Sequence, residues 1–194
     1  FSTNTSRRRA VLRPEERTGY RDAARESADG TVTFLSSTHR FDTNSEIFCH
    51  DGPLKTESLL WWLKLEGFEH FAWPVLGFET CDDAPDEIHT GYERWFRSWV
   101  CEHAVADEPG FLRRDWIPHS VSLRILNWSR YLAWAGETLK KETQRAMTYQ
   151  VAKNAAFLSD HVEYDLDGNH LVENAAALVA AGVLTGTDRW CTQG

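Results

Sequence analysis

The chain is poor in cysteine, in long apolar runs and in positive charge, and each shortage excludes a class of protein. Its four cysteines are widely spaced and include no C-x-x-C pair. The sequence therefore indicates neither a zinc site nor a disulfide framework. No apolar run reaches the roughly 18 residues that a membrane span needs, and no signal peptide is visible. No signature recurs with a period of about 33 or 34 residues, so ankyrin and tetratricopeptide arrays are not expected.

Positive charge is outnumbered, with 29 acidic against 21 basic residues and a net charge of −8. This balance argues against a general nucleic-acid-binding surface. Sixteen of the 21 basic residues are arginine, a side chain that binds carboxylates or sulfates through two parallel hydrogen bonds. Biased genomic composition explains an arginine excess equally well. What is abundant is apolar surface, because 42% of the 194 residues are hydrophobic, which is enough for a sizeable core.

The hydrophobic pattern predicts an all-α protein with one short strand near its start. Residues 1–30 are highly charged and poor in large apolar groups, so we expect a peripheral segment followed by one domain over residues 31–194. The alternating "TVTFL" of residues 31–35 predicts the strand. Five helices are predicted after it, at about residues 57–73, 91–105, 119–139, 140–164 and 165–181.

The residues that end these helices and the lengths of the connections indicate how the helices are arranged. Pro74 should end the first helix, and Gly182 should end the fifth as its C′ residue. Because the connections are short, successive helices should be antiparallel neighbours. The chain opens on Phe1 and closes without a final element, which we interpret as the mark of a segment of a longer protein.

The third predicted helix carries a polar stripe within its apolar pattern. Four residues share one face at spacing i, i+4, i+7 and i+11: Ser120, Arg124, Asn127 and Tyr131. The stripe has two interpretations, a solvated outer face or the wall of a groove that binds a polar ligand. Arg124 could bind a sugar carboxylate or sulfate there, or it could form an internal ion pair with a carboxylate such as Glu173.

The fifth predicted helix is apolar almost all round, and its polar groups are confined to the first turn. They are Asn169, His170, Glu173 and Asn174. A structural explanation is available, because Asp167 or Asn169 could cap the helix and Glu173 could complement its positive end. The alternative is a ligand site at the mouth of a buried helix.

Two motifs in these helices resemble the heparinase II/III-like polysaccharide lyases, a superfamily that also contains alginate lyases. "WIPHSVSLRILNW" (Trp116–Trp128) is similar to a family segment that starts W-x-P-Y and continues with Ser, Arg and Asn-Trp. "GNHLVENAAAL" (Gly168–Leu178) is similar to G-N-H-L-x-E-N-A-x-A-L. The segment "LLWWLKLEGFEHF" resembles the family's upstream aromatic helix more loosely. His119 stands where the family has Tyr, and residues 1–30 match nothing in it.

The resemblance implies a fold and an activity. The fold would be an incomplete (α/α) toroid of antiparallel helical hairpins, and the activity would be cleavage of an acidic polysaccharide, heparan-sulfate-like or alginate-like, by β-elimination without a cofactor or metal. A catalytic Tyr, further helices and a β-sandwich domain with another His would lie beyond residue 194. A periplasmic or secreted location would follow, and this segment alone would be inactive.

The chemistry of that reaction suggests roles for the residues. Removing the C5 proton, which is α to a carboxylate, adds charge to an anion, so neutral or cationic donors must stabilise the enolate-like transition state. We therefore predict Asn169 and His170 as catalytic residues that hold the uronate carboxylate. The predicted substrate-binding residues are Glu173, Arg124, Asn127, Trp128 and Tyr131. Two alternatives remain: a glycoside hydrolase that uses Asp165, Asp167 or Glu173, and a non-catalytic glycan-binding domain.

Overall fold

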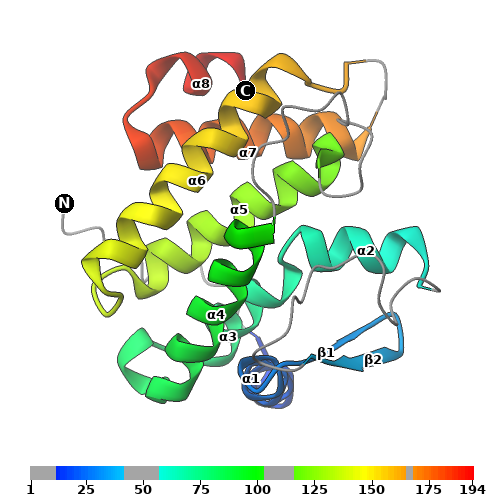
Figure 1. Ribbon diagram of the computed structural model, residues 1–194, viewed down its shortest axis with the longest axis vertical. Coiled ribbons are helices and arrows are strands. Elements are labelled where there is room, and N and C mark those ends of the chain that lie inside the picture. Colours follow the sequence, from blue (N-terminus) through cyan, green and yellow to red (C-terminus); the bar gives the residue numbers. More distant parts are fainter. Residues whose placement is uncertain (1–11, 42–56, 103–115, 165–167) are drawn as a thin grey trace.

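The computed structural model describes residues 12–41, 57–102, 116–164 and 168–194, and it is mostly helical (Figure 1). The elements in chain order are α1 (Pro14–Ala28), β1 (Thr31–Phe34), β2 (Ser37–Arg40), α2 (Leu59–Glu66), η3 (Glu69–Phe71), α3 (Ala72–Gly77), η4 (Cys81–Asp83), α4 (Asp86–Glu102), α5 (Pro118–Ala135), α6 (Lys141–Asp160), α7 (Asn169–Thr185) and α8 (Asp188–Gln193). Helix α5 is central, because it contacts α2, α3, α6 and α7. The all-α prediction is thus confirmed at the level of helical content.

The predicted strand is confirmed as β1, and a second strand that was not predicted pairs with it. β1 and β2 are antiparallel, with Thr31 opposite Arg40 and Phe34 opposite Ser37. The two turn residues between the strands are left-handed, with φ of 53° at Leu35 and 66° at Ser36. Such a turn normally carries Asn-Gly or a similar pair, so the sequence contained no turn signal. The hairpin forms because Val32 and Phe34 are buried in the core.

Giving this turn the residues it favours should stabilise the protein. We expect the double variant Leu35→Asn, Ser36→Gly to raise the free energy of unfolding by about 1 kcal/mol, because relief of two left-handed residues exceeds the extra freedom of Gly in the unfolded chain. Urea unfolding followed by circular dichroism measures the change. Thr38→Asn, in the extended part of β2, is the control and should give no gain. An equal or lower stability of the double variant would contradict the prediction.

The predicted helix over residues 57–73 is wrong as a single element. α2 ends at Glu66, Phe68 adopts a left-handed conformation with φ of 54°, and η3 and α3 follow. Tertiary burial overrides the helical periodicity here, because the break directs both Phe68 and Phe71 into the core with no exposed surface. Pro74 does not end a helix but lies in the first turn of α3, where a missing N–H is tolerated.

The last predicted helix is confirmed, but its end was misplaced. α7 continues through Gly182 and stops before Gly186, which has φ of 70°. Gly182 is needed for close packing, since a Cβ there would lie 2.5 Å from Cys191 Sγ in α8. On the outer side of α7, three valines remain exposed: Val172, Val179 and Val183.

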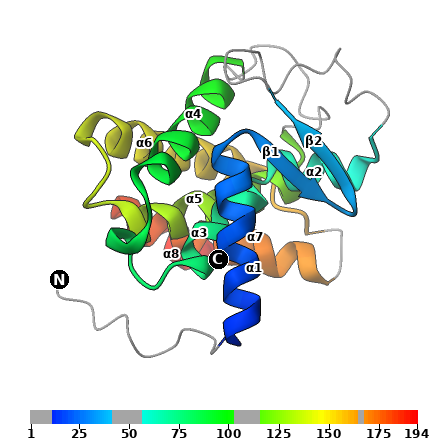
Figure 2. The same ribbon diagram turned by 90° about the horizontal axis from the view of Figure 1, so that it is seen from below.

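The N-terminal segment differs from the expected peripheral segment. Residues 14–28 form α1, which lies along α3 and α4 (Figure 2). Ala24, Ser27 and Ala28 are buried, and the Trp95 side chain donates from Nε1 to the Ser27 carbonyl at 2.8 Å. The C-terminal half of α1 is therefore part of the core. None of the described helices combines the length and the apolar character needed to cross a membrane.

Candidate functional site

The polar stripe of α5 points into the protein, so both positions considered for it were wrong. The stripe residues are at most 5% exposed: Ser120, Arg124, Asn127 and Tyr131. Trp128, also predicted to bind substrate, has no exposed surface. A ligand arriving from solvent cannot reach these side chains in this arrangement. The stripe was assigned to solvent or to a groove because sequence spacing defines a shared face but not what covers it.

Arg124 is bound entirely by interior groups. Its Nε and Nη2 donate to Asn154 Oδ1 at 3.0 and 2.7 Å, and its Nη1 donates to the Glu66 carbonyl at 2.9 Å. The Glu66 carboxylate lies 3.9 Å from Nη1, and the guanidinium sits 4.3 Å from the Trp99 ring centre. The internal ion pair considered for Arg124 therefore exists, but its partner is Glu66 in place of Glu173.

The neighbouring stripe residues also have interior partners. Asn127 Nδ2 donates to the Gly67 carbonyl at 2.8 Å, and the Tyr131 hydroxyl lies 3.4 Å from His89 Nδ1. Burial raises the pKa of Tyr131 above its ordinary value. Together, Arg124 and Asn127 satisfy carbonyls left open where α2 ends at Glu66 and Gly67. Arg124 and Asn127 of the stripe thus supply hydrogen-bond donors to the carbonyls at the C-terminal end of α2.

A different group of polar side chains gathers where the first turns of α5 and α7 meet. His119 from α5 and His170 from α7 stack with ring centres 4.3 Å apart and planes 15° apart. Both side chains are partly exposed, at 16% and 42%. Because α5 and α7 pack together, two residues 51 positions apart in sequence form one surface feature, which we call the histidine pair.

Each member of the histidine pair has a carboxylate beside it. Glu163, on the connection after α6, places Oε1 and Oε2 at 3.5 and 3.4 Å from His170 Nδ1. Glu173 Oε2 lies 2.8 Å from His119 Nδ1, although the two atoms are not aligned as a hydrogen bond. We treat this second contact as electrostatic. Glu173, which was predicted to bind substrate, thus contacts a histidine of the neighbouring helix.

Asn174 ties the site to the interior. It is fully buried, and its Nδ2 donates to Ser122 Oγ of α5 at 2.9 Å. Its Oδ1 accepts from the Glu163 backbone N–H at 3.0 Å. One amide therefore fixes α7, α5 and the Glu163 connection relative to one another.

Asn169, the other predicted catalytic residue, is exposed at the first position of α7. It does not cap the helix, because the N-cap is Gly168 with φ of 113° and no side chain caps this end. Asp165 and Asp167 lie outside the described residues. Asn169, His170 and Glu173 are thus all at least partly exposed in the first turns of α7. Sequence reasoning missed Glu163, which belongs to no motif, and noted His119 only as a departure from the family pattern.

The histidine pair can accept or donate hydrogen bonds through its ring nitrogens, and the two carboxylates can orient the rings. His70, by contrast, is fully buried, and burial lowers its pKa to about 3. Within the described ranges, no group of three or more His, Cys, Asp or Glu side chains is arranged to hold a metal ion. Cys81, Cys101 and Cys191 are free thiols, and Cys49 lies outside the described residues.

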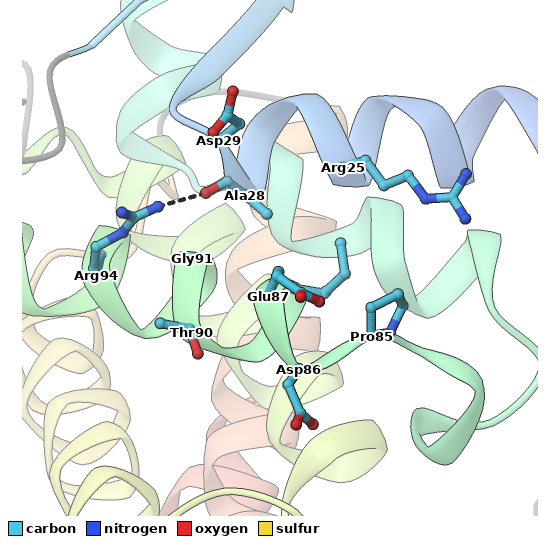
Figure 3. Close-up of a pocket in the computed structure, with 10 residues that line it drawn as sticks. Arg25, Ala28, Asp29, Pro85, Asp86, Glu87, Thr90, Gly91 and Arg94 are labelled. Carbon is cyan, nitrogen blue, oxygen red and sulfur yellow. Dashed lines mark hydrogen bonds between the residues drawn. The ribbon is translucent and has the colours of Figure 1, made fainter.

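A groove of about 660 Å³ lies elsewhere, between the end of α1 and the first half of α4 (Figure 3). Arg94 donates across it to the Ala28 carbonyl at 2.6 Å. Its charged lining residues are Arg25, Arg94, Asp29, Asp86 and Glu87. Three carboxylates against two guanidinium groups do not favour an acidic ligand. Despite its size, we therefore place the candidate site at the histidine pair, where the chemistry is concentrated.

Comparison of the chain with protein-family models, with curated proteins and with solved structures gave no match.

Proposed function

We propose that this chain is the N-terminal part of a polysaccharide lyase that cleaves a uronic-acid-containing polysaccharide by β-elimination. One observation carries the proposal: the two segments that resemble the lyase family, Trp116–Trp128 and Gly168–Leu178, meet in space. Their contact includes polar side chains, with His119 stacked on His170 and Asn174 bonded to Ser122. Neither the spacing within each motif nor helix packing in general requires such a polar junction.

Asn169 and His170 have different roles in the proposed reaction. The exposed Asn169 amide, at the positive end of α7, donates hydrogen bonds to the uronate carboxylate and stabilises the charge that develops there. His170 accepts the C5 proton. The electron pair of the C5–H bond then forms the C4=C5 double bond while the bond from C4 to the glycosidic oxygen breaks. That oxygen takes up a proton from the catalytic Tyr that the resemblance places beyond residue 194, and the proton removed from C5 balances it. One C–H and one C–O bond are thus exchanged for a C=C and an O–H bond.

The incomplete toroid belongs to the same proposal, and the outer side of α7 supports it. Val172, Val179 and Val183 are exposed, and the chain has no charged residue between Glu173 and Asp188. A surface helix normally carries charged or polar residues on its outer face. An apolar outer face suits a helix that packs against a further hairpin of a ring.

The test is to incubate the longer protein with heparan sulfate and with alginate, and to follow the ultraviolet absorbance of the unsaturated uronate. We expect absorbance to appear with one of these substrates, and Asn169→Ala to slow it by about 10²–10³-fold, the usual effect of losing one such donor. Gln193→Ala removes an exposed amide on α8 and should leave the rate unchanged. The 194-residue chain alone should bind uronate oligosaccharides without cleaving them.

The outcomes separate the alternatives. New reducing ends without ultraviolet absorbance would identify a hydrolase and overturn the proposal. Binding without cleavage by the longer protein would identify a glycan-binding domain. Turnover by the 194 residues alone would contradict the assignment of essential groups to a region beyond residue 194.

A further inference from the structure

The carboxylates beside the histidine pair determine which ring nitrogen carries the proton. Glu163 faces Nδ1 of His170 at 3.4 Å, and Glu173 faces Nδ1 of His119 at 2.8 Å. A neutral imidazole has one N–H and one lone pair. The lone pair of an unprotonated Nδ1 at these distances from a carboxylate oxygen is repelled, whereas an N–H is attracted. For His119, whose Nδ1 is not aligned with Glu173 Oε2 as a hydrogen bond, this preference is electrostatic alone. Both rings therefore favour the tautomer with the proton on Nδ1.

The carboxylate beside His170 is held in place. The Glu163 side chain is 13% exposed, its backbone N–H donates to Asn174 Oδ1, and its Oε2 lies 3.4 Å from Asn174 Nδ2. Asn174 is itself fixed to Ser122. The position of Glu163 is thus set by a buried amide, so its effect on His170 is built into the packing of α5 and α7.

In the Nδ1–H tautomer, the opposite nitrogen of each ring, Nε2, carries the lone pair. Among the described residues, neither His119 Nε2 nor His170 Nε2 has a hydrogen-bond partner. The lone pair of each Nε2 is therefore available to a ligand.

We propose that Glu163 and Glu173 are positioning residues that hold His170 and His119 in the Nδ1–H form, so that His170 presents Nε2 as a proton acceptor. The catalytic use of that acceptor rests on the proposed lyase function. In that reaction Nε2 takes the C5 proton and Glu163 stabilises the resulting imidazolium. Recognition of the uronate carboxylate then falls to Asn169, in contrast to the sequence prediction that gave His170 this role.

The tautomers can be measured without any substrate. In the 194-residue chain labelled with ¹⁵N, long-range ¹H–¹⁵N spectra at alkaline pH distinguish the protonated from the bare ring nitrogen. We expect the Nδ1–H form for both histidines. Glu163→Ala should return His170, and Glu173→Ala should return His119, to the tautomer mixture of a free imidazole. Glu137→Ala removes an exposed carboxylate distant from the pair and should change neither.

Two further variants are controls that distinguish a change of tautomer from a loss of local folding. Glu163→Gln retains an oxygen acceptor at the same position and should keep His170 in the Nδ1–H form, and Glu173→Gln should do the same for His119. The Nε2–H form in the unmodified chain, or tautomers unaffected by both Ala variants, would overturn the proposal.

Kinetics of the longer protein separate this inference from the lyase proposal. Glu163→Ala should lower kcat on the order of 10²-fold with little change in KM, because the proton acceptor is misoriented while carboxylate binding is retained. Glu163→Gln should recover most of that loss. If the tautomers are as expected but no uronan is cleaved, the positioning role stands and the lyase function fails. If cleavage occurs with the Nε2–H form of His170, the lyase function stands and the positioning role fails.

Discussion

Replacing Arg124 by methionine should lower the free energy of unfolding by about 3–5 kcal/mol, the usual result of removing one partner of a buried charge pair. Methionine fills most of the space but removes the donors to the Glu66 carbonyl and the Asn154 oxygen, and with them the positive charge beside the Glu66 carboxylate. For a chain of this length the melting temperature should fall by roughly 6–20 °C. Chemical and thermal unfolding followed by circular dichroism measure both quantities.

Arg124→Lys tests whether charge alone is sufficient. A single ammonium cannot reproduce the planar fork that reaches both Asn154 and the Glu66 carbonyl, so this variant should also lose stability, by less than the methionine variant. Arg145→Met, at an exposed position on α6, is the matched control and should change little. Because Arg124 is inaccessible to ligands, uronate affinity should not change while the protein stays folded. Unchanged stability with weakened binding would restore the ligand-binding role predicted from the sequence.

At Phe68, glycine should be tolerated better than alanine, which reverses the normal order inside a core. Phe68 is fully buried and left-handed, with φ of 54° and ψ of 40°. Phe68→Ala should cost about 3–5 kcal/mol through loss of packing and creation of a cavity. Phe68→Gly loses the same ring but relieves a backbone conformation that costs an L-residue about 1–2 kcal/mol. We therefore expect the glycine variant to be the more stable of the two by about 1 kcal/mol.

Phe71 provides the control for this comparison, since it is also fully buried but has an ordinary φ of −67°. There Phe71→Gly should be less stable than Phe71→Ala. Urea unfolding of the four variants under one set of conditions gives the two differences. If glycine is the worse substitution at both positions, the left-handed residue stores no strain and the break after α2 needs another explanation.

The local hydrophobic pattern was sufficient to predict the later helices but not the first predicted helix, over residues 57–73. The apolar periodicity around Trp95 and Trp99 and that of α5 to α7 agreed with packing, so these helices could be predicted. The periodicity of residues 57–73 continued across Gly67 and Phe68, where burial of two phenylalanines decides the conformation. The β2 strand was missed because its turn has left-handed Leu and Ser, which no turn rule favours.

The candidate site, like the fold, could be predicted from the sequence only in part. The first turn of α7 could be predicted, because its polar residues follow a turn and precede an apolar run. Its partners could not, since His119 and Glu163 come from other elements and share no sequence pattern with it. The α5 stripe was misplaced for a related reason: the carbonyls that it binds become available only where α2 breaks, a feature absent from the local pattern of α5.

Helix α5 is anchored at two levels along its axis. Its middle turns are fastened to the Glu66 and Gly67 carbonyls through Arg124 and Asn127, and its first turn carries His119 and Ser122 against α7. A slide of α5 by even one residue, a 1.5 Å rise, would break the hydrogen bonds from Arg124 and Asn127 to these carbonyls. The hydrogen bonds to the end of α2 therefore fix the position of His119 along the axis of α5, and so its position relative to His170.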